Sequence, residues 1–264
     1  MTTATSPVSV RLRRLALAFA PVLAVTLALG LAEILQARGA LPVVIPAPSA
    51  VWADAVKNPA AVTRHLTPTV LKALSGYAIA AGIALFAAAV ASMVVVLRAP
   101  IYNLGVGLHS VPLIATTPLL ALWLGTGPPT HVLVAALACY FPMLVGAMQG
   151  FRAVERTRLE LFHTLSASPL QQLRYLVIPS ALPYLFAGFK IAAPSAVLGT
   201  ITAEWAGAEL GLGALMLYAL GAFDINKVWL SVVLACGLSA AAYAFWALAE
   251  RLVIYWESST ELKD

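Results

Sequence analysis

Long runs of apolar residues set the strongest limit on what this chain can fold into. The sequence has 264 residues, of which 61% are hydrophobic and only 10% are charged. A soluble domain of this length needs far more polar surface, so we predict an all-α polytopic membrane protein with about six transmembrane helices. The predicted spans are 15–35, 71–97, 102–124, 131–148, 182–202 and 228–248.

The loops between these spans divide the chain. We expect an N-terminal segment at 1–14, the first span at 15–35, an extracytoplasmic segment at 36–68, a core at 69–254 and a tail at 255–264. Pro48 and Ser49 should open a short helix within the extracytoplasmic segment. Loops assigned to the cytoplasm carry ten Lys and Arg residues against five outside, which predicts cytoplasmic N- and C-termini.

One long polar stretch, 151–181, interrupts the apolar pattern. It predicts two short amphipathic helices, split near 166–169 and ended before Pro179, because the residue before a proline disfavours helix. A basic, folded loop between spans suggests a docking surface on the cytoplasmic side. The alternative is that its arginines only set the membrane orientation. Orientation needs only a few arginines and does not need a patterned loop of roughly thirty residues.

The sequence offers little chemistry of its own. The four histidines are scattered, and Glu160 and His163 have no further ligand near them in sequence, so we expect no metal site, cofactor or catalytic residue. The sequence contains no Gly-x-x-x-x-Gly-Lys-Ser/Thr phosphate loop. The net charge of +5 is explained by Arg and Lys at the loops and lipid headgroups, so membrane lipid is an expected partner and nucleic acid is not.

Glu160, Leu161 and Phe162 are followed by three residues, then Ser166, then nine residues, then Leu-Val-Ile-Pro ending at Pro179. This arrangement resembles the EAA loop of binding-protein-dependent ABC importer permeases, which reads Glu-Ala-Ala, three residues, Gly, nine residues and Ile-x-Leu-Pro. The spacing fits without a gap. The chain departs from the pattern at Leu161, Phe162 and Ser166, where small residues would allow close helix packing and a glycine would allow a tight turn.

Three other segments carry the same resemblance: IPAPSAVW at 45–52, HSVPLIATTPLLALWLGTG at 109–127 and PSALPYLFAGFKIA at 179–192. They look like the branch of that family that imports sulfonates, taurine, nitrate and pyrimidine-type vitamin precursors. The resemblance implies a type I ABC importer permease-like bundle in the bacterial plasma (inner) membrane. The implied function is transport of a small polar or anionic solute into the cytoplasm.

The resemblance also implies the partners. A homodimer of this chain would work with two copies of an ABC ATPase subunit and an extracytoplasmic substrate-binding protein, and ATP would be hydrolysed on the partner, so the chain itself is not an enzyme. The loop would lie in a groove of the ATPase. The implied coupling residues are Glu160, Leu161, Phe162, Leu165, Ser166, Ala167, Ser168, Pro169, Ile178 and Pro179.

Small and hydroxylated residues recur at helical spacing in the third and fifth spans, where they allow two interpretations. In the fifth span they indicate either close helix packing or a pathway lining. In the third span they either satisfy backbone groups freed by Pro112 and Pro118 or line the pathway. The candidate pathway residues are His109, Thr116, Thr117, Ser195, Gly199 and Thr202.

Two charged residues near the fifth span are interpreted as interfacial. Lys190 is expected to extend toward the cytoplasmic headgroups, and Glu204 to be solvated at the external end.

Two other classes of protein predict different features in the sequence. An ion-coupled secondary transporter predicts several buried acids and an internal repeat, but only Glu33 comes close and no repeat is visible. A membrane-embedded enzyme needs a His, Asp and Glu constellation inside the spans, and none is visible.

Overall fold

The computed structural model describes residues 7–256, and every regular element in that part of the chain is a helix. Residues 1–6 of the predicted N-terminal segment and 257–264 of the predicted tail lie outside the described residues. The α-helices are α1 (Pro7–Ala37), α2 (Pro48–Lys57), α3 (Pro59–Met93), α4 (Arg98–Ser110), α5 (Leu113–Leu124), α6 (Pro128–Gly150), α7 (Arg156–Thr164), α8 (Pro169–Gln172), α9 (Ile178–Glu204), α10 (Leu212–Gly221) and α11 (Ile225–Val253). A 3₁₀ turn (Val95–Leu97) precedes α4, and a π-helical turn (Leu173–Val177) joins α8 to α9.

The predicted all-α membrane fold is confirmed. Four helical stretches are long and apolar enough to cross a membrane, namely α3, α6, the continuous stretch Pro169–Glu204, and α11. The α4–α5 pair qualifies as a broken fifth span, and α1 contributes a further apolar stretch at Leu23–Ala37. Among the described residues, four to five candidate spans are present against the approximately six that the sequence predicts.

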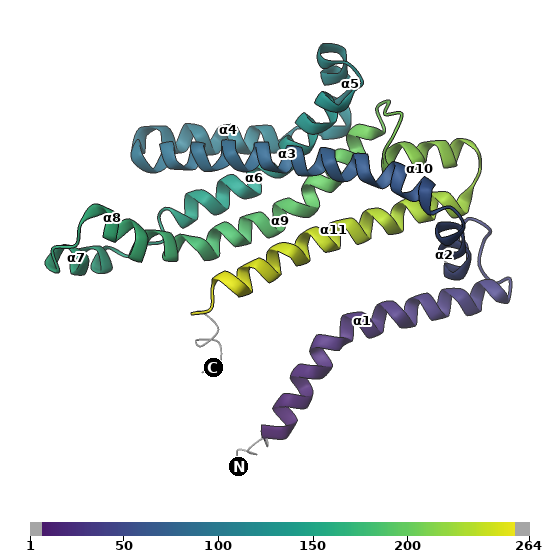
Figure 1. Ribbon diagram of the computed structural model, residues 1–264, viewed down its shortest axis with the longest axis horizontal. Helices are drawn as coiled ribbons and strands as arrows, with labels where there is room; N and C mark the ends of the chain where they lie inside the picture. The colour runs from purple at the N-terminus through teal and green to yellow at the C-terminus, as the bar shows by residue number, and fades with distance from the viewer. Residues whose placement is uncertain (1–6, 257–264) are drawn as a thin grey trace.

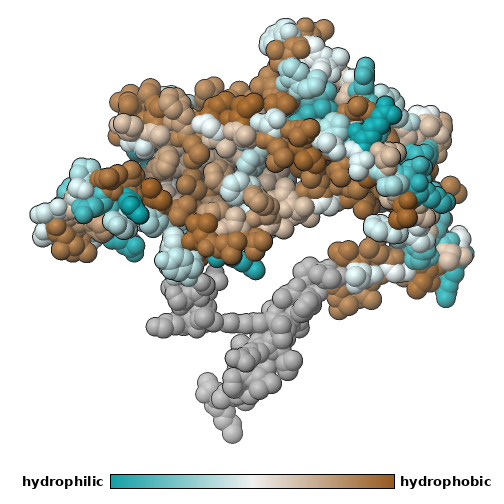
Figure 2. Space-filling view, in the orientation of Figure 1, coloured by the Kyte–Doolittle hydropathy of each residue, from teal (hydrophilic) through white to brown (hydrophobic). Residues whose placement is uncertain are grey.

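The helices α3, α4, α6, α9 and α11 run side by side (Figure 1). α7 and α8 project from one end of this bundle and α2 and α10 lie at the other, and α1 packs against α2. Figure 2 shows hydrophilic residues gathered at both ends and a mostly hydrophobic surface between them. This distribution fits a bilayer, in which the middle of the surface contacts hydrocarbon and the ends contact water.

α6 and α9 pack in contact along their length because glycines bring their backbones together. A Cβ placed on Gly146 would lie 2.6 Å from the carbonyl oxygen of Tyr184, and one on Gly188 would lie 2.8 Å from that of Pro142. Small residues at a helix interface favour association in lipid, where helices gain little from the hydrophobic effect. Alanines of α3 complete this core, including Ala84 and Ala88, which are fully buried.

The third predicted span is not one helix. α4 ends at Ser110 and α5 begins at Leu113, and the two helices meet at 95°. Val111 adopts an extended conformation (ψ 127°) because the proline ring that follows it disfavours helix, and Pro112 becomes the N-cap of α5. Pro118 and Pro142, in contrast, are tolerated inside α5 and α6.

Several predicted boundaries are also wrong. α3 begins at Pro59, so part of the expected extracytoplasmic segment is helical, and it ends at Met93 rather than 97. The external loop at 203–227 contains the apolar helix α10. The second helix of the polar stretch does not end before Pro179, because the π-helical turn at Leu173–Val177 continues it into α9, of which Pro179 is the second residue. The short helix opened by Pro48 is confirmed as α2.

Candidate functional site

The polar stretch between α6 and α9 folds into two short helices split where the sequence predicts. α7 has no buried residue, and Figure 1 shows it at the tip of the segment, away from the long helices. Glu155 and Arg158 form an exposed ion pair with 3.3 Å between Oε2 and Nε, and such pairs contribute little to stability. The bundle therefore leaves the surface of α7 free for another molecule.

Ser166, which occupies the glycine position of the EAA-loop pattern, follows α7 in a left-handed conformation. Its φ is +53°, in the left-handed region that favours glycine. The amide of Ser166 donates to the carbonyl of His163 at 2.9 Å, and the amide of Ala167 donates to that of Phe162 at 3.0 Å. These two bonds form a Schellman motif, which satisfies carbonyls that the end of the helix leaves without partners.

Ser168 begins α8 with a reciprocal cap. Its hydroxyl accepts a hydrogen bond from the amide of Gln171, and the Gln171 side chain accepts one from the amide of Ser168 at 2.8 Å. Pro169 occupies the first turn, where its fixed φ favours helix. Gln172 ties the turn back to the carbonyl of Ala167 at 3.0 Å. The turn from 165 to 169 is therefore held by defined hydrogen bonds that fix the angle between α7 and α8.

The surface of this segment combines exposed leucines with charges. Leu161, Leu165 and Leu170 are 56%, 69% and 72% exposed, and Glu160 is exposed beside them. Phe162 and Ala167 are half-buried. Such exposed apolar side chains on a polar segment at the end of the bundle are typical of interaction surfaces. Of the other predicted coupling residues, Ser168, Pro169 and Ile178 are exposed and Pro179 is half-buried.

The small residues of the fifth predicted span lie along one side of α9, at the edge of its contact with α6. Gly199 faces α6, where an added Cβ would lie 2.6 Å from the Cβ of Ala138, so its role is helix packing. Ser195, four residues before Gly199, and Thr202, three residues after it, lie next to it toward the exposed side of the helix and are half-buried. Their hydroxyls donate to the carbonyls of Ile191 at 3.0 Å and Leu198 at 2.9 Å.

On this exposed side, apolar residues recur along the length of α9. Tyr184, Ile191, Leu198 and Trp205 are all exposed and recur at helical spacing with Ser195 and Thr202. We call the six residues the open face of α9. A helix that buries only one stripe in its own bundle leaves the other for lipid, solute or another protein.

The candidate residues of the third predicted span lie on either side of the break. His109, at the end of α4, is exposed and stacks on Phe141 with 5.1 Å between ring centroids. Thr116 and Thr117 lie in α5 and donate to the carbonyl of Leu113 at 3.1 and 2.6 Å. Thr117 is buried, so its hydroxyl serves the backbone of the kinked region, whereas Thr116 is half-buried.

The prediction for Glu204 is wrong, because this residue is fully buried rather than solvated. Its carboxylate accepts hydrogen bonds from Lys72 Nζ at 3.0 Å, from Thr69 Oγ1 at 2.8 Å and from the amide of Gly213 at 2.8 Å. Lys72 also donates to the carbonyl of Leu210 at 2.8 Å. A buried charge requires an opposite charge and filled hydrogen bonds, and this site provides both.

The same cluster fixes α10 against α3. Thr69 accepts a hydrogen bond from the amide of Leu212 at 2.8 Å, and His65 Nδ1 lies 3.0 Å from the carbonyl oxygen of Gly211. Gly211 has a φ of +142°, and an added Cβ would overlap the carboxylate of Glu204. Sequence reasoning missed the pairing because these residues are more than a hundred positions apart. The available signal was one acid and one lysine, each at the outer end of an apolar span.

Lys190 also differs from its expectation. It does not extend freely to the headgroups but pairs with Glu250 of α11, with 2.5 Å between Nζ and Oε2. Beside this pair, Trp246 packs on Phe189 and Tyr77. Glu33, the acid that would have suited an ion-coupled carrier, accepts hydrogen bonds from the hydroxyl and amide of Ser49 at the start of α2.

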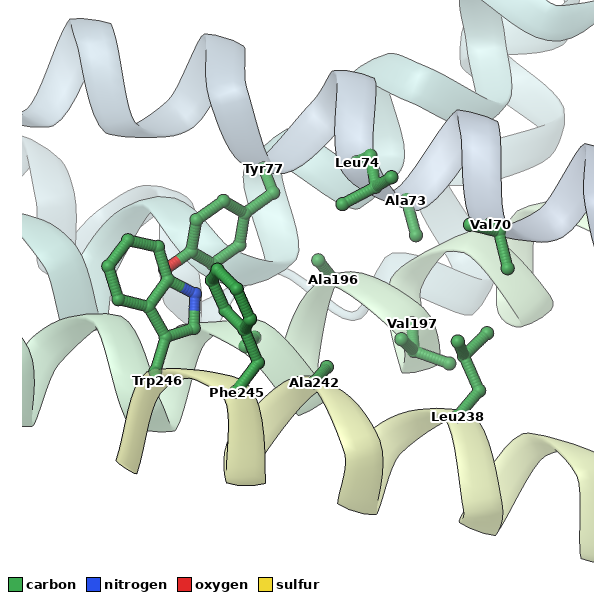
Figure 3. A pocket seen from close by; sticks show the side chains of 11 residues that line it. Val70, Ala73, Leu74, Tyr77, Ala196, Val197, Leu238, Ala242, Phe245 and Trp246 are labelled. Atoms are coloured by element: carbon green, nitrogen blue, oxygen red, sulfur yellow. The ribbon is translucent and has the colours of Figure 1, made fainter. Parts of the chain in front are cut away.

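An apolar cavity of about 300 Å³ lies between α3, α9 and α11 (Figure 3). Leu74, Leu238 and Phe245 are among its lining residues, and no charged side chain lines it. Tyr77, at one end, donates its hydroxyl to the carbonyl of Phe189 at 3.1 Å. Without polar groups to orient a polar solute, this cavity is suited to hydrocarbon rather than to transport cargo.

Comparison with known proteins identifies the bundle. Residues 80–254 match the family of binding-protein-dependent transport system inner membrane components. The chain belongs to this family. It is thus a multi-pass plasma membrane protein and the membrane permease component of an ABC transport system, which favours that interpretation over an ion-coupled carrier.

Individual relatives agree with this assignment. The riboflavin transport system permease protein RibX of Chloroflexus aurantiacus is 34% identical over 57% of this chain and 56% of its own length. A probable ABC transporter permease of Haemophilus influenzae is 27% identical over 84% of this chain and 91% of its own. The putative aliphatic sulfonates transport permease protein SsuC of Bacillus subtilis is 30% identical over 58% of this chain and 56% of its own length. The chain thus spans little more than half the length of RibX and of SsuC.

Proposed function

We propose that this permease moves a small polar or anionic solute into the cytoplasm, driven by ATP hydrolysis on a separate ATPase subunit that docks on the α7–α8 segment. The observation that carries the proposal is the form of that segment. It presents exposed Leu161, Leu165 and Leu170 beside Glu160, and its turn at Ser166 is held by a Schellman motif. A rigid, partly apolar projection fits a groove in a partner, because little entropy is lost when it binds.

The orientation follows from the charges. The polar stretch that holds this segment carries Arg152, Arg156, Arg158 and Arg174, and an excess of arginine favours the cytoplasm. This supports an orientation with α7, α8 and both termini in the cytoplasm and with α2, α10 and the Lys72 cluster at the outer face. A substrate-binding protein would deliver the solute to that outer face.

The open face of α9 supports the proposal of a second permease copy. Its exposed apolar residues, including Ile191, Leu198 and Trp205, alternate with the hydroxylated Ser195 and Thr202. Two such faces brought together enclose a lining of mixed polarity, which suits a passage for a polar solute. Ser195 and Thr202 are the pathway candidates that this arrangement favours, with His109 and Thr116 near the α4–α5 break.

The solute class is proposed from the relatives. RibX is named for riboflavin and SsuC for aliphatic sulfonates. These compounds share polarity and small size rather than one functional group. The solute proposed for this chain is accordingly a sulfonate, nitrate or pyrimidine-precursor type.

The test is purification of the tagged permease from native membranes in mild detergent, followed by an assay for vanadate-sensitive ATPase activity. We expect a copurifying ATPase with the wild type and its loss in Glu160→Lys, with the permease still folded. Glu209→Lys is the matched control, because Glu209 is an equally exposed acid in the loop before α10. An ATPase-free preparation that still transports in vesicles would overturn the proposal, as would normal copurification with Glu160→Lys.

A further inference from the structure

A second cavity, of about 480 Å³, opens at the end of the bundle that carries the α7–α8 segment. Its polar lining residues are Tyr102 of α4, Gln149 of α6, Arg152 just after α6, and Tyr184 of α9. Val145 and Met148 are among the residues that form the apolar part of the wall. None of these residues belongs to the coupling surface, and Tyr184 alone belongs to the open face of α9.

Every polar side chain that lines this cavity can donate a hydrogen bond. Arg152 supplies a guanidinium, Gln149 an amide, and Tyr102 and Tyr184 supply phenol hydroxyls. No acidic side chain lines the cavity, and Arg152 forms no ion pair with another described residue. The cavity therefore carries an uncompensated positive charge surrounded by donors, and its volume lies within the range of small-molecule sites.

This chemistry selects an oxyanion. A guanidinium binds two oxygens of a sulfonate, carboxylate or phosphate through parallel N–H donors. Tyrosine hydroxyls can donate to the third oxygen of a sulfonate or phosphate, or to the free lone pairs of a carboxylate. A cation would be repelled by Arg152 and would find few acceptors. A neutral apolar compound would leave the four polar side chains without partners, which is unfavourable once water is displaced.

The cavity also lies where a solute would leave the protein. Tyr184 is the first residue of the open face of α9, which continues through Ile191 and Ser195 toward the other end of the bundle. We propose that this cavity is a release site at the cytoplasmic mouth, and that Arg152, Tyr102 and Tyr184 bind the oxyanion group of a small solute there. The proposal rests on the proposed function for its orientation and narrows the transported solute to one that carries an oxyanion.

The test measures binding of trifluoromethanesulfonate to the full-length permease in phosphatidylcholine nanodiscs by ¹⁹F NMR line broadening, at constant ionic strength. Arg152→Gln should raise the apparent Kd at least about tenfold, which corresponds to about 1.4 kcal/mol. Tyr102→Phe and Tyr184→Phe should each raise it severalfold without changing the thermal unfolding midpoint. Arg152→Lys keeps the charge and should retain part of the affinity, which shows that the site still folds.

Arg174→Gln is the control, because it removes an arginine of the same polar stretch that does not line the cavity. Equal losses of affinity in Arg152→Gln and Arg174→Gln would mean general electrostatic attraction and would overturn the proposal, as would no binding to the wild type. A lipid phosphate is the other source of an oxyanion. The same variants are therefore compared in nanodiscs that contain phosphatidylglycerol. If the wild type retains this lipid, Arg152→Gln does not, and neither binds the sulfonate, then the cavity is a lipid site and the solute site is refuted.

The experiment separates this inference from the proposed function, because it uses the permease alone. ATPase copurification should be normal in Arg152→Gln. Sulfonate binding to the permease, together with the absence of a copurifying ATPase in the pull-down, would leave the cavity assigned and refute only the proposed energy source. ATPase copurification without sulfonate binding would refute only the release site.

Discussion

Loss of Lys72 should be among the most damaging single changes to the end of the bundle that carries α10. Lys72→Met keeps most of the side-chain volume but leaves the fully buried Glu204 without its opposite charge. Removing one partner of a buried pair costs about 3–5 kcal/mol. Thr69 and the amide of Gly213 still donate to the carboxylate, so we expect the low end, about 3 kcal/mol.

The measurement is the apparent melting temperature of the purified permease in detergent. A loss of about 3 kcal/mol corresponds to roughly 6–12 °C at 2–4 °C per kcal/mol. Lys190→Met is the matched control, because its pair with Glu250 leaves the two side chains 20% and 25% exposed, and water then offsets part of the loss. We expect that control to shift the melting temperature by no more than half as much.

The double variant Lys72→Met/Glu204→Gln isolates the pair. Because it removes both charges, it should recover at least about 1 kcal/mol relative to the sum of the single changes. The reasoning is refuted if Lys72→Met destabilises no more than Lys190→Met, or if the double variant shows no recovery.

Three further changes test other features. Gly199→Ala should destabilise by about 1–3 kcal/mol, because its Cβ would lie 2.6 Å from the facing side chain of α6, whereas Gly237→Ala, with nothing within 4 Å, should be neutral in the same melting assay. Ser166→Gly should keep or slightly raise stability and retain ATPase copurification, whereas Ser166→Val should lower both, because a β-branched residue is strained at a φ of +53°. A side-chain hydrogen bond from Lys227 lowers the pKa of Asp224 in the folded protein below its ordinary value of 3.8. The ionised Asp224 therefore contributes its full stabilisation above pH 3.8 and loses it as the pH falls through the lowered pKa of the folded state. Asp224→Asn should therefore cost up to about 1 kcal/mol at pH 7, and melting curves of the two proteins should converge below pH 3.8.

Local sequence signals were enough for the parts of the fold that depend on neighbouring residues. The apolar runs predicted the helices, and the interval 166–169 correctly separated α7 from α8. Ser166 was recognised by its place in a spaced motif, and its left-handed conformation agrees with a position where that motif has glycine. Prolines were the least predictable residues: Pro112 breaks a span, whereas Pro68 and Pro142 do not. The difference depends on whether neighbouring helices support the freed backbone groups, which the local sequence does not specify.

Long-range pairing explains the remaining errors. Glu204 was predicted to be solvated because its partner Lys72 lies 132 positions earlier in the sequence. A neighbouring helix likewise decides the role of the pathway candidates on α9, because Gly199 packs against α6 whereas Ser195 lies toward the exposed side. Helical spacing gives the direction in which a side chain points from the axis of its own helix, but it does not identify the helix that packs against that side chain.

The glycine contacts between α6 and α9 have a mechanical consequence. Side chains can yield and absorb a displacement, but backbones in contact through Gly146 and Gly188 cannot slide past each other without a steric clash. The polar segment joins the end of α6 to the start of α9, and α9 is 27 residues long, roughly 40 Å at 1.5 Å per residue. Whatever displaces α7 and α8 is therefore expected to move α6 and α9 together, and the buried Glu204 at the far end of α9 links that movement to α10 and α3.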